Sequence, residues 1–433
     1  MSTTQVDIRR RELERSLAAG DATRALELSA ALLESDSGNP DLLRLRAAAL
    51  MAADRTDAAV DLLRDAANVA GAPGAIRSAL AMCQFAAGEH AAAAETFREV
   101  LADRPDDFVA RLAYAECLDL LGEGDAALPE YFRAVNVAQA QGRWLSDAST
   151  GPAMRGRVKR AMDVIDHGRQ ALFERILQPH VDAFGREAMA RVAEALRIHV
   201  GTQAAPQGDP RQQPKFFWMP SLPPTAFFPR SDFAWYDALE AAAPAIGEEL
   251  RGVLDAGHEL APFLQIDDAN AEEDYLGGDP QSRSWDALFF YRHGERRAQA
   301  HADCPRTSLA LQGVPLTRIA DHAPEVLFSV LAPQTHIKPH HGVTNTRVVT
   351  HLPLVIPPGD CALVVGGQSH AWQAGRCVTF DDTFLHEAWN RTDQRRVVLI
   401  LDTWNPFLRA EECIALKDLV EGIGHFNRQA ATG

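Results

Sequence analysis

Hydrophobic and polar positions in the first third of the chain follow a helical spacing, and the pattern repeats along the sequence. The surrounding segments resemble one another, as in AAGDATRAL, AADRTDAAV, AAGEHAAAA and LLGEGDAAL. Small or turn-forming residues recur every 34 positions in two series, Gly20, Asp54, Gly88 and Gly122, and Ala25, Ala59, Ala93 and Ala127. This spacing predicts pairs of helices that approach each other closely at the small residues.

A period of this length with two helices per repeat is typical of tetratricopeptide arrays, and we assign residues 1–140 to an all-α solenoid of this kind. Each helix pair buries its apolar face on the next pair, so that the array forms a concave surface. Pro40, Pro73 and Pro105 recur near the repeat ends, where a proline punctuates a helix. The alternative is an alanine-rich bundle whose spacing is accidental.

The period is lost after the repeats, and residues 141–205 are expected to cap and connect the array with helices over 154–169 and 186–199. Residues 202–230 contain seven prolines, which indicates a domain boundary followed by an extended segment. An amphipathic helix is expected next, ending near residue 254.

Ser231 or Asp232 is the expected N-cap of that helix. From Trp285 onward, short runs of β-branched and aromatic residues are separated by turn signals, without helices between them. Such spacing predicts that residues 206–433 form a mainly-β jelly-roll domain, a double-stranded β-helix with flanking helices, the last over 410–426.

Composition narrows the class of protein further. The 433 residues allow two to four domains, and the net charge of −16 argues against nucleic-acid or anionic-membrane binding as the main function. The six cysteines are scattered without a C-x-x-C pair, so reduced thiols are expected rather than a disulfide framework. With no signal or membrane-spanning segment recognised, we expect a cytoplasmic protein, and the alanine- and arginine-rich composition favours a bacterial source.

Histidines crowd the strand-rich region, and two phrases hold the most informative ones, residues 335–359 and 380–406. A jelly roll with two histidines at its mouth is the scaffold of non-haem Fe(II) oxygenases, whose usual protein ligands are two histidines and one carboxylate. The carboxylate ordinarily stands two residues after the first histidine. That position after His340 is Gly342, which offers no ligand.

Several motifs in this region occur together. They are Trp285 nine residues before Gly294, Ser329 eleven residues before His340, P-H-x-G at 339–342, T-N-x-R at 344–347, H-L-x-L-V-I-P at 351–357, F-D-D-x-F-x-H-E-x-W at 380–389, Arg396, and D-x-W-x-P at 402–406. On these motifs, residues 210–410 resemble the aspartyl/asparaginyl β-hydroxylases, a family that depends on Fe(II) and 2-oxoglutarate and in which helical repeats also precede the oxygenase domain.

The resemblance implies a metal site of His340 and His386 alone, because the missing carboxylate is a mark of the family. It also implies that 2-oxoglutarate is bound by Trp285, Ser329, His351 and Arg396, and that O2 is the second cosubstrate. A guanidinium such as that of Arg396 suits the distal carboxylate of 2-oxoglutarate.

Arg347 is the residue expected to bind a substrate carboxylate. The chain departs from the family at Val349, where an arginine is often found, which leaves one fewer cation for a carboxylate of the cosubstrate or substrate.

Other polar residues near the motifs have plainer interpretations. His336 and His341 are expected to lie outside the metal site, and Asp381 and Asp382 to shape the turn before His386. Trp372, Trp389 and Trp404 are expected to pack rather than to bind substrate.

The sequence therefore predicts a 2-oxoglutarate-dependent dioxygenase that hydroxylates an unactivated C–H bond, by resemblance the β-carbon of Asp or Asn in a peptide or protein presented by the repeats. Two alternatives stay open. The same chemistry could act on a free amino acid or small metabolite, or the chain could be a repeat adaptor with a degenerate oxygenase domain. A lipid substrate is not expected, because the chain is acidic and no anchor is recognised.

Overall fold

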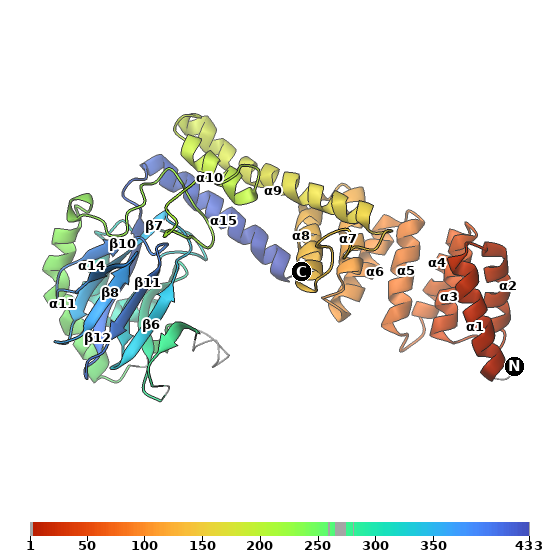
Figure 1. Cartoon of the computed structure of the whole chain (residues 1–433), viewed down its shortest axis with the longest axis horizontal. Helices are drawn as coiled ribbons and strands as arrows, with labels where there is room; N and C mark the ends of the chain where they lie inside the picture. Colours follow the sequence, from red (N-terminus) through yellow and green to blue (C-terminus); the bar gives the residue numbers. More distant parts are fainter. Residues whose placement is uncertain (1–2, 259, 265–273, 280, 433) are drawn as a thin grey trace. The chain divides into compact units, whose positions relative to one another are not determined.

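The computed structural model describes residues 3–258, 260–264, 274–279 and 281–432. The chain divides into two compact units, Met1–Arg169 with Phe426–Gly433, and Gln170–His425 (Figure 1). The segment 141–205, predicted to connect the domains, contributes residues to both units, and the predicted domain boundaries at 140 and 205 stay predictions. Within the described ranges, every helix is too short or too polar to cross a bilayer.

The first unit confirms the predicted helical repeats. Its helices are α1 (Thr3–Ala18), α2 (Ala22–Leu33), α3 (Pro40–Ala52), α4 (Thr56–Ala67), α5 (Gly74–Ala86), α6 (His90–Asp103), α7 (Phe108–Leu120) and α8 (Gly124–Ala140). Pro40 occupies the first turn of α3 and Pro73 the N-cap of α5, so two of the recurring prolines mark helix starts.

The two 34-residue series serve different purposes. Gly20, Asp54, Gly88 and Gly122 each end the first helix of a pair with a positive φ, between 55° and 81°. A Cβ at any of the three glycines would meet open space, so glycine is used there for its backbone freedom and not for close helix approach. Close packing belongs to the second series, because Ala25, Ala59, Ala93 and Ala127 are at most 1% exposed.

The connecting helices are longer or later than predicted. Helix α9 spans Arg155–Phe184 and α10 spans Ala190–Val200. The helical hydrophobic spacing continues past residue 169, since Phe173 and Leu177 are buried on one face of α9, and Pro179 inside the helix does not end it.

The second unit contains two antiparallel sheets, which confirms the β-rich C-terminal domain. The large sheet has the order β1-β3-β5-β12-β7-β10, with β4 paired to β3, and the small sheet has the order β2-β6-β11-β8-β9. The strands are β1 (Ala261–Pro262), β2 (Leu276–Gly277), β3 (Trp285–Arg292), β4 (Glu295–Arg296), β5 (Val326–Leu331), β6 (Thr335–His340), β7 (Arg347–Val355), β8 (Cys361–Val365), β9 (Gln368–His370), β10 (Val378–Phe380), β11 (His386–Asn390) and β12 (Arg396–Trp404).

Helix α11 (Tyr236–Asp255) covers the outer face of the large sheet, where Ile246 and Leu250 pack against Phe328 and Leu399 (Figure 1). Both faces of β5 are therefore buried, which is why its sequence is apolar at every position except Ser329 and does not alternate.

The predicted cap of α11 is wrong. The helix begins at Tyr236, and Ser231 and Asp232 belong to a separate 3₁₀ turn, η1 (Arg230–Asp232). Arg230 of that turn pairs with Glu240 of the helix, so an ion pair joins the two elements where a single helix was expected.

The expectation of strands without intervening helices is also wrong at one place. The short helices α13 (Ala298–Asp303) and α14 (Pro305–Leu311) lie between β4 and β5. Glu249 of α11 accepts hydrogen bonds from the backbone N–H groups of Arg306 and Thr307, and this carboxylate satisfies the first turn of α14.

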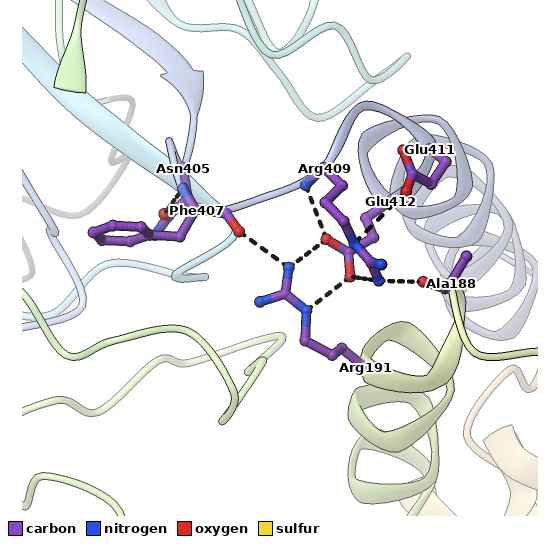
Figure 2. Close-up of polar contacts among 7 residues, drawn as sticks. All are labelled: Ala188, Arg191, Asn405, Phe407, Arg409, Glu411 and Glu412. Atoms are coloured by element: carbon purple, nitrogen blue, oxygen red, sulfur yellow. Dashed lines mark hydrogen bonds and ion pairs between the residues drawn. The ribbon is translucent and has the colours of Figure 1, made fainter.

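The buried carboxylate of Glu412 connects the segment after β12 with helix α10 through ion pairs and hydrogen bonds (Figure 2). Glu412, in the first turn of α15 (Ala410–Thr432), pairs with both Arg191 of α10 and Arg409, and its side chain is fully buried. Arg191 also donates to the carbonyl of Phe407, and the Phe407 N–H donates to Asn405. The Asn405 side chain in turn donates to the carbonyl of Asn345, in the loop between β6 and β7.

The proline-rich segment supports the loops on either side of the two motif histidines. The N–H of Lys215 donates to the carbonyl of Gly342, and the N–H of Gln213 donates to that of Thr383. The N–H of Asp381 donates to the carbonyl of Ala226. This segment was expected to mark a boundary, and in the structure it also braces the turns next to His340 and His386.

Candidate active site

A cavity of about 150 Å³ opens between the two sheets and is lined by side chains from β3, β5, β7, β10 and β12 of the large sheet and from β6, β8 and β11 of the small sheet. All seven residues singled out from the sequence line it, namely Trp285, Ser329, His340, Arg347, His351, His386 and Arg396. The structure thus brings together residues that lie up to 111 positions apart in the chain (396 − 285).

His340 and His386 form the centre of this pocket. They are direct partners in the β6–β11 pair, and their ring centroids are 4.1 Å apart. Nδ1 of His340 lies 2.8 Å from the carbonyl of Lys338, and Nδ1 of His386 lies 3.0 Å from that of Phe384. A carbonyl can only accept, so each Nδ1 carries the hydrogen and each Nε2 keeps its lone pair, the tautomer in which metal-binding histidines are commonly held.

The environment also keeps both imidazoles neutral. Burial lowers the pKa of His340, and burial together with His340 lowers the pKa of His386 to about 4. A neutral imidazole is the form that binds a metal. Within the described ranges no group of three or more His, Cys, Asp or Glu side chains is arranged to hold a metal ion.

Asp382 lies beside the histidine pair, contrary to the plainer interpretation of this residue. A Cβ on Gly342 would overlap the Asp382 carboxylate, so the aspartate fills the space that a side chain two residues after His340 would need. Its Oδ2 accepts from Arg347, whereas its buried Oδ1 has no hydrogen-bond partner in the part of the chain that the structure describes. Asp381 behaves as expected, because its Oδ1 accepts from the Thr383 N–H and shapes the turn before His386.

One end of the pocket, which we call the arginine end, is formed by Trp285, Ser329, His351 and Arg396. Arg396 is 1% exposed, and among the described residues no carboxylate pairs with it. Its guanidinium lies 4.8 Å from the ring centre of Trp372, and burial lowers its pKa to about 10. A buried guanidinium without a counter-ion is costly, which fits a site that receives an anion.

Ser329 is oriented for the same anion. Its Oγ accepts from the Trp285 indole N–H at 2.9 Å and from Nη1 of Arg396 at 3.3 Å. These two donors occupy both lone pairs of the hydroxyl, so its own hydrogen is left to donate to a carboxylate oxygen. Phe263 stacks on Trp285 at 3.8 Å and fixes the indole plane.

His351 completes the arginine end. Burial and the nearby Arg396 keep the pKa of His351 well below the usual range, so the imidazole is neutral. Its buried Nδ1 has no hydrogen-bond partner among the described residues. On β7 the pocket-facing residues are Arg347, Val349 and His351, at every second position. Val349 therefore places an apolar side chain between an arginine and a histidine.

The opposite end, which we call the acidic end, is formed by Glu325, Arg347, Asp382 and Asp402. Arg347 donates from Nη2 to Asp382 and from Nη1 to Asp402, both at 3.1 Å. Burial lowers the pKa of Arg347, but the two carboxylates outweigh that effect and raise it above its usual range. The residue predicted to bind a substrate carboxylate is thus already engaged by two internal ones.

Glu325 and Asp402 were missed by the sequence interpretation. Burial raises the pKa of Glu325 to about 7, and the Glu325 N–H donates to Asp402 at 2.9 Å. Strand alternation was the available signal, because Asp402 lies an even number of residues after Arg396, and Glu325 precedes Ser329 by an even number.

The remaining polar and aromatic candidates lie outside the lining of this pocket, as expected. His336 pairs with Glu387 at 2.7 Å, and His341 lies 2.9 Å from the carbonyl of Thr383. Trp389 donates to Asp360, and Trp372 packs beneath Arg396. The six cysteines are all free.

Comparison with known proteins identifies the kind of domain that carries this pocket. Residues 240–406 match the family described as aspartyl/asparaginyl beta-hydroxylase, and residues 84–146 match a tetratricopeptide repeat. "Aspartate beta-hydroxylase domain-containing protein 2" of Rattus norvegicus is 31% identical over 55% of this chain and 68% of its own length. "Ornithine lipid ester-linked acyl 2-hydroxylase" of Rhizobium tropici is 33% identical over 47% of this chain and 73% of its own length.

Among solved structures, MamA protein is similar at 14% identity over 47% of this chain and 98% of that chain, with a TM-score of 0.31. A TM-score of this size is too low to carry an argument about the fold of the chain.

Proposed function

The chain belongs to the aspartyl/asparaginyl β-hydroxylase family, and from this premise we propose that it is an Fe(II)- and 2-oxoglutarate-dependent dioxygenase. One observation carries the proposal: His340, His386 and Arg396 line the same cavity. The two imidazoles are neutral and are each held by a backbone carbonyl, and the arginine is buried without a carboxylate partner among the described residues. The two-sheet arrangement with histidines on neighbouring strands of one sheet also suits the jelly roll of such enzymes.

The residues present fit the two groups. Nε2 of His340 and Nε2 of His386 would hold the metal, with the Asp382 carboxylate close to both imidazoles. Arg396 and the Ser329 hydroxyl would bind the distal carboxylate of 2-oxoglutarate, with Trp285 and His351 beside it. When bound, a ferrous ion with 2-oxoglutarate supplies dioxygen activation, in which decarboxylation to succinate accompanies hydroxylation of a C–H bond.

The chain itself contributes orientation and exclusion of water. Arg396, Ser329 and Trp285 fix the cosubstrate in one pose, because each is hydrogen-bonded to another member of the set and both Arg396 and Ser329 are buried. The apolar side chains Leu363, Phe380 and Ile400 complete the lining and keep competing water away from the reacting centre.

The substrate most consistent with the family is a peptide or protein that is hydroxylated at the β-carbon of an Asp or Asn residue. The helical repeats would present this substrate, in a reducing, cytoplasmic environment. A second candidate is an acyl chain of a lipid, because a relative in the family is named for hydroxylation of an ornithine lipid.

Formation of succinate by the purified protein with Fe(II), 2-oxoglutarate and O2 tests the proposal. The expected result is turnover that His340→Ala abolishes and that His336→Ala, on the same strand but outside the pocket, preserves. Arg395→Ala serves as the matched control for Arg396→Ala, because Arg395 is the exposed neighbour. Absence of turnover together with absence of metal and 2-oxoglutarate binding would contradict the proposal and favour the adaptor.

A further inference from the structure

The acidic end of the pocket contains two partly exposed side chains. The side chains of Glu325 and Arg347 are 21% and 15% exposed, whereas Arg396 at the other end is 1% exposed. Both ends border on the histidine pair, since Asp382 acts electrostatically on His340 and His386, and His386 acts on His351. A group held at the acidic end therefore lies next to the reacting centre.

The charges at this end leave no cation for a substrate carboxylate. Among the described residues that line the pocket, the cations are Arg347 and Arg396, and the anions are Glu325, Asp382 and Asp402. Arg347 is engaged by two of these carboxylates, and the proposed function assigns Arg396 to 2-oxoglutarate. The charges of a ferrous ion and of the 2-oxoglutarate dianion cancel. Asp382 and Asp402 together outweigh the single charge of Arg347 even when Glu325, whose pKa burial raises to about 7, is protonated, so the acidic end keeps an excess of negative charge.

Lys215 does not change this balance. It acts electrostatically on His340, but it is exposed and does not line the cavity. A carboxylate at the acidic end would lose its hydration and face like charges, which costs several kcal/mol.

The same end offers hydrogen-bond acceptors in need of donors. Oε1 of Glu325 accepts from the His293 N–H at 2.7 Å and lies 2.9 Å from Nδ1 of His293, whereas its buried Oε2 has no partner among the described residues. Oδ1 of Asp382 likewise has no partner among them, and Asp382 is only 6% exposed. The N–H groups of an amide or an ammonium group can satisfy such oxygens, and they would also offset the burial that raises the pKa of Glu325.

We propose, on the basis of the oxygenase function above, that the acidic end selects a substrate group with N–H donors and no negative charge, an amide or an ammonium group, and rejects a carboxylate. In peptide terms, the site accepts asparagine and not aspartate. Val349 is part of this selection, because it faces the acidic end next to Arg347 and adds no cation.

The inference can be tested with blocked single residues and a redox-inert metal. The protein is loaded with Mn(II) and 2-oxoglutarate, and the paramagnetic relaxation of the protons of three probes is measured. The probes are N-acetyl-asparagine amide, N-acetyl-aspartate amide and the corresponding 2,4-diaminobutyrate derivative, which carries an ammonium group. The asparagine and diaminobutyrate probes are expected to bind at least ~10-fold more tightly than the aspartate probe.

Two variants sharpen the result. Val349→Arg adds a cation at the acidic end and is expected to shift the preference toward the aspartate probe, with Val349→Met as the size-matched control. Glu325→Gln keeps the shape of the side chain and removes a charge, so it is expected to weaken the diaminobutyrate probe more than the asparagine probe. This second variant decides the matter if Val349→Arg does not fold.

The outcomes separate this inference from the function on which it rests. Failure of Mn(II) to bind, seen in the relaxation of water protons, would contradict the proposed function itself. Bound Mn(II) with an equal or stronger effect on the aspartate probe, or with no effect on any of the three, would overturn the inference alone.

Discussion

The two buried arginines of the pocket differ in what surrounds them. Arg347 at the acidic end donates to Asp382 and Asp402, whereas Arg396 at the arginine end has a serine hydroxyl and the face of an indole as its contacts among the described residues. The same side chain therefore serves structure at one end of the cavity and binding at the other. A guanidinium whose charge is already balanced holds strands together, and one whose charge is not balanced is prepared for an anion.

Replacement of Arg347 is expected to have the largest effect on folding. In Arg347→Met, Asp382 and Asp402 would be buried without their cation, at a cost of about 3–5 kcal/mol in the free energy of unfolding. Urea denaturation measures this loss, with the exposed Arg395→Met as control. A stability within ~1 kcal/mol of wild type would show that the two ends do not differ in this way.

Replacement of Arg396 is expected to affect binding rather than folding. Without cosubstrate, Arg396→Met removes a buried charge that lacks a counter-ion, so the free energy of unfolding should change by less than ~1 kcal/mol or increase. Affinity for 2-oxoglutarate should fall by about 2–5 kcal/mol, because a charge-assisted contact is lost. Calorimetric titration checks the second effect, and an unchanged affinity would remove Arg396 from the cosubstrate site.

Glu412 extends the comparison to a buried carboxylate with two cations (Figure 2). Burial raises its pKa, but hydrogen bonds from Arg191 and Arg409 outweigh burial and lower the pKa to about 2, from an unfolded value near 4.5. Because the folded pKa is depressed, the stabilisation is complete above about pH 4.5 and is lost as the pH falls toward 2.

The predicted loss for Glu412→Gln is ~2–3 kcal/mol at neutral pH, and the difference from wild type should shrink as the pH falls through that window. Unfolding measured at a series of pH values provides the test. A difference that stays constant with pH would mean that packing, and not charge, accounts for the contribution of Glu412.

The smallest expected effect on stability lies in the repeats, where it depends on backbone conformation and not on charge. Gly88 has a φ of 79° with open space around it. Gly88→Ala should cost about 1–2 kcal/mol, and Gly88→Asn should cost less, because asparagine tolerates this conformation and Asp54 adopts it at the equivalent position. Thermal unfolding of the two variants gives the order, and equal losses would contradict the conformational explanation.

The repeats and the pocket also differ in how far the sequence predicts them. Spacing alone identifies the repeats and the close packing at Ala93, because both depend on residues nearby in the chain, whereas Gly88 ends a helix instead of admitting a close neighbour. The ends of α9 and α11 could not be predicted as well from the sequence, because tertiary contacts such as the Arg230–Glu240 ion pair influence where a helix starts.

In the pocket, the motif residues were found because strand alternation and family resemblance agree on them. The pairing of Arg347 with Asp382 and Asp402 could not be found in this way, because the register of β7 and β12 brings Asp402 to Arg347 and the loop between β10 and β11 brings Asp382 to it. Whether a charge is compensated is a property of the fold, and it decides here between a structural and a binding role.

Anaerobic spectroscopy of the Fe(II)-loaded protein tests the central claim most directly. Addition of 2-oxoglutarate to wild type, His336→Ala and Arg395→Ala should produce the visible charge-transfer absorption of an Fe(II)–2-oxo acid complex. Arg396→Met should need a far higher concentration of 2-oxoglutarate, and His340→Ala should give no absorption. An absorption that persists unchanged in His340→Ala, or that is missing from wild type, would contradict the assignment of this cavity as the active site.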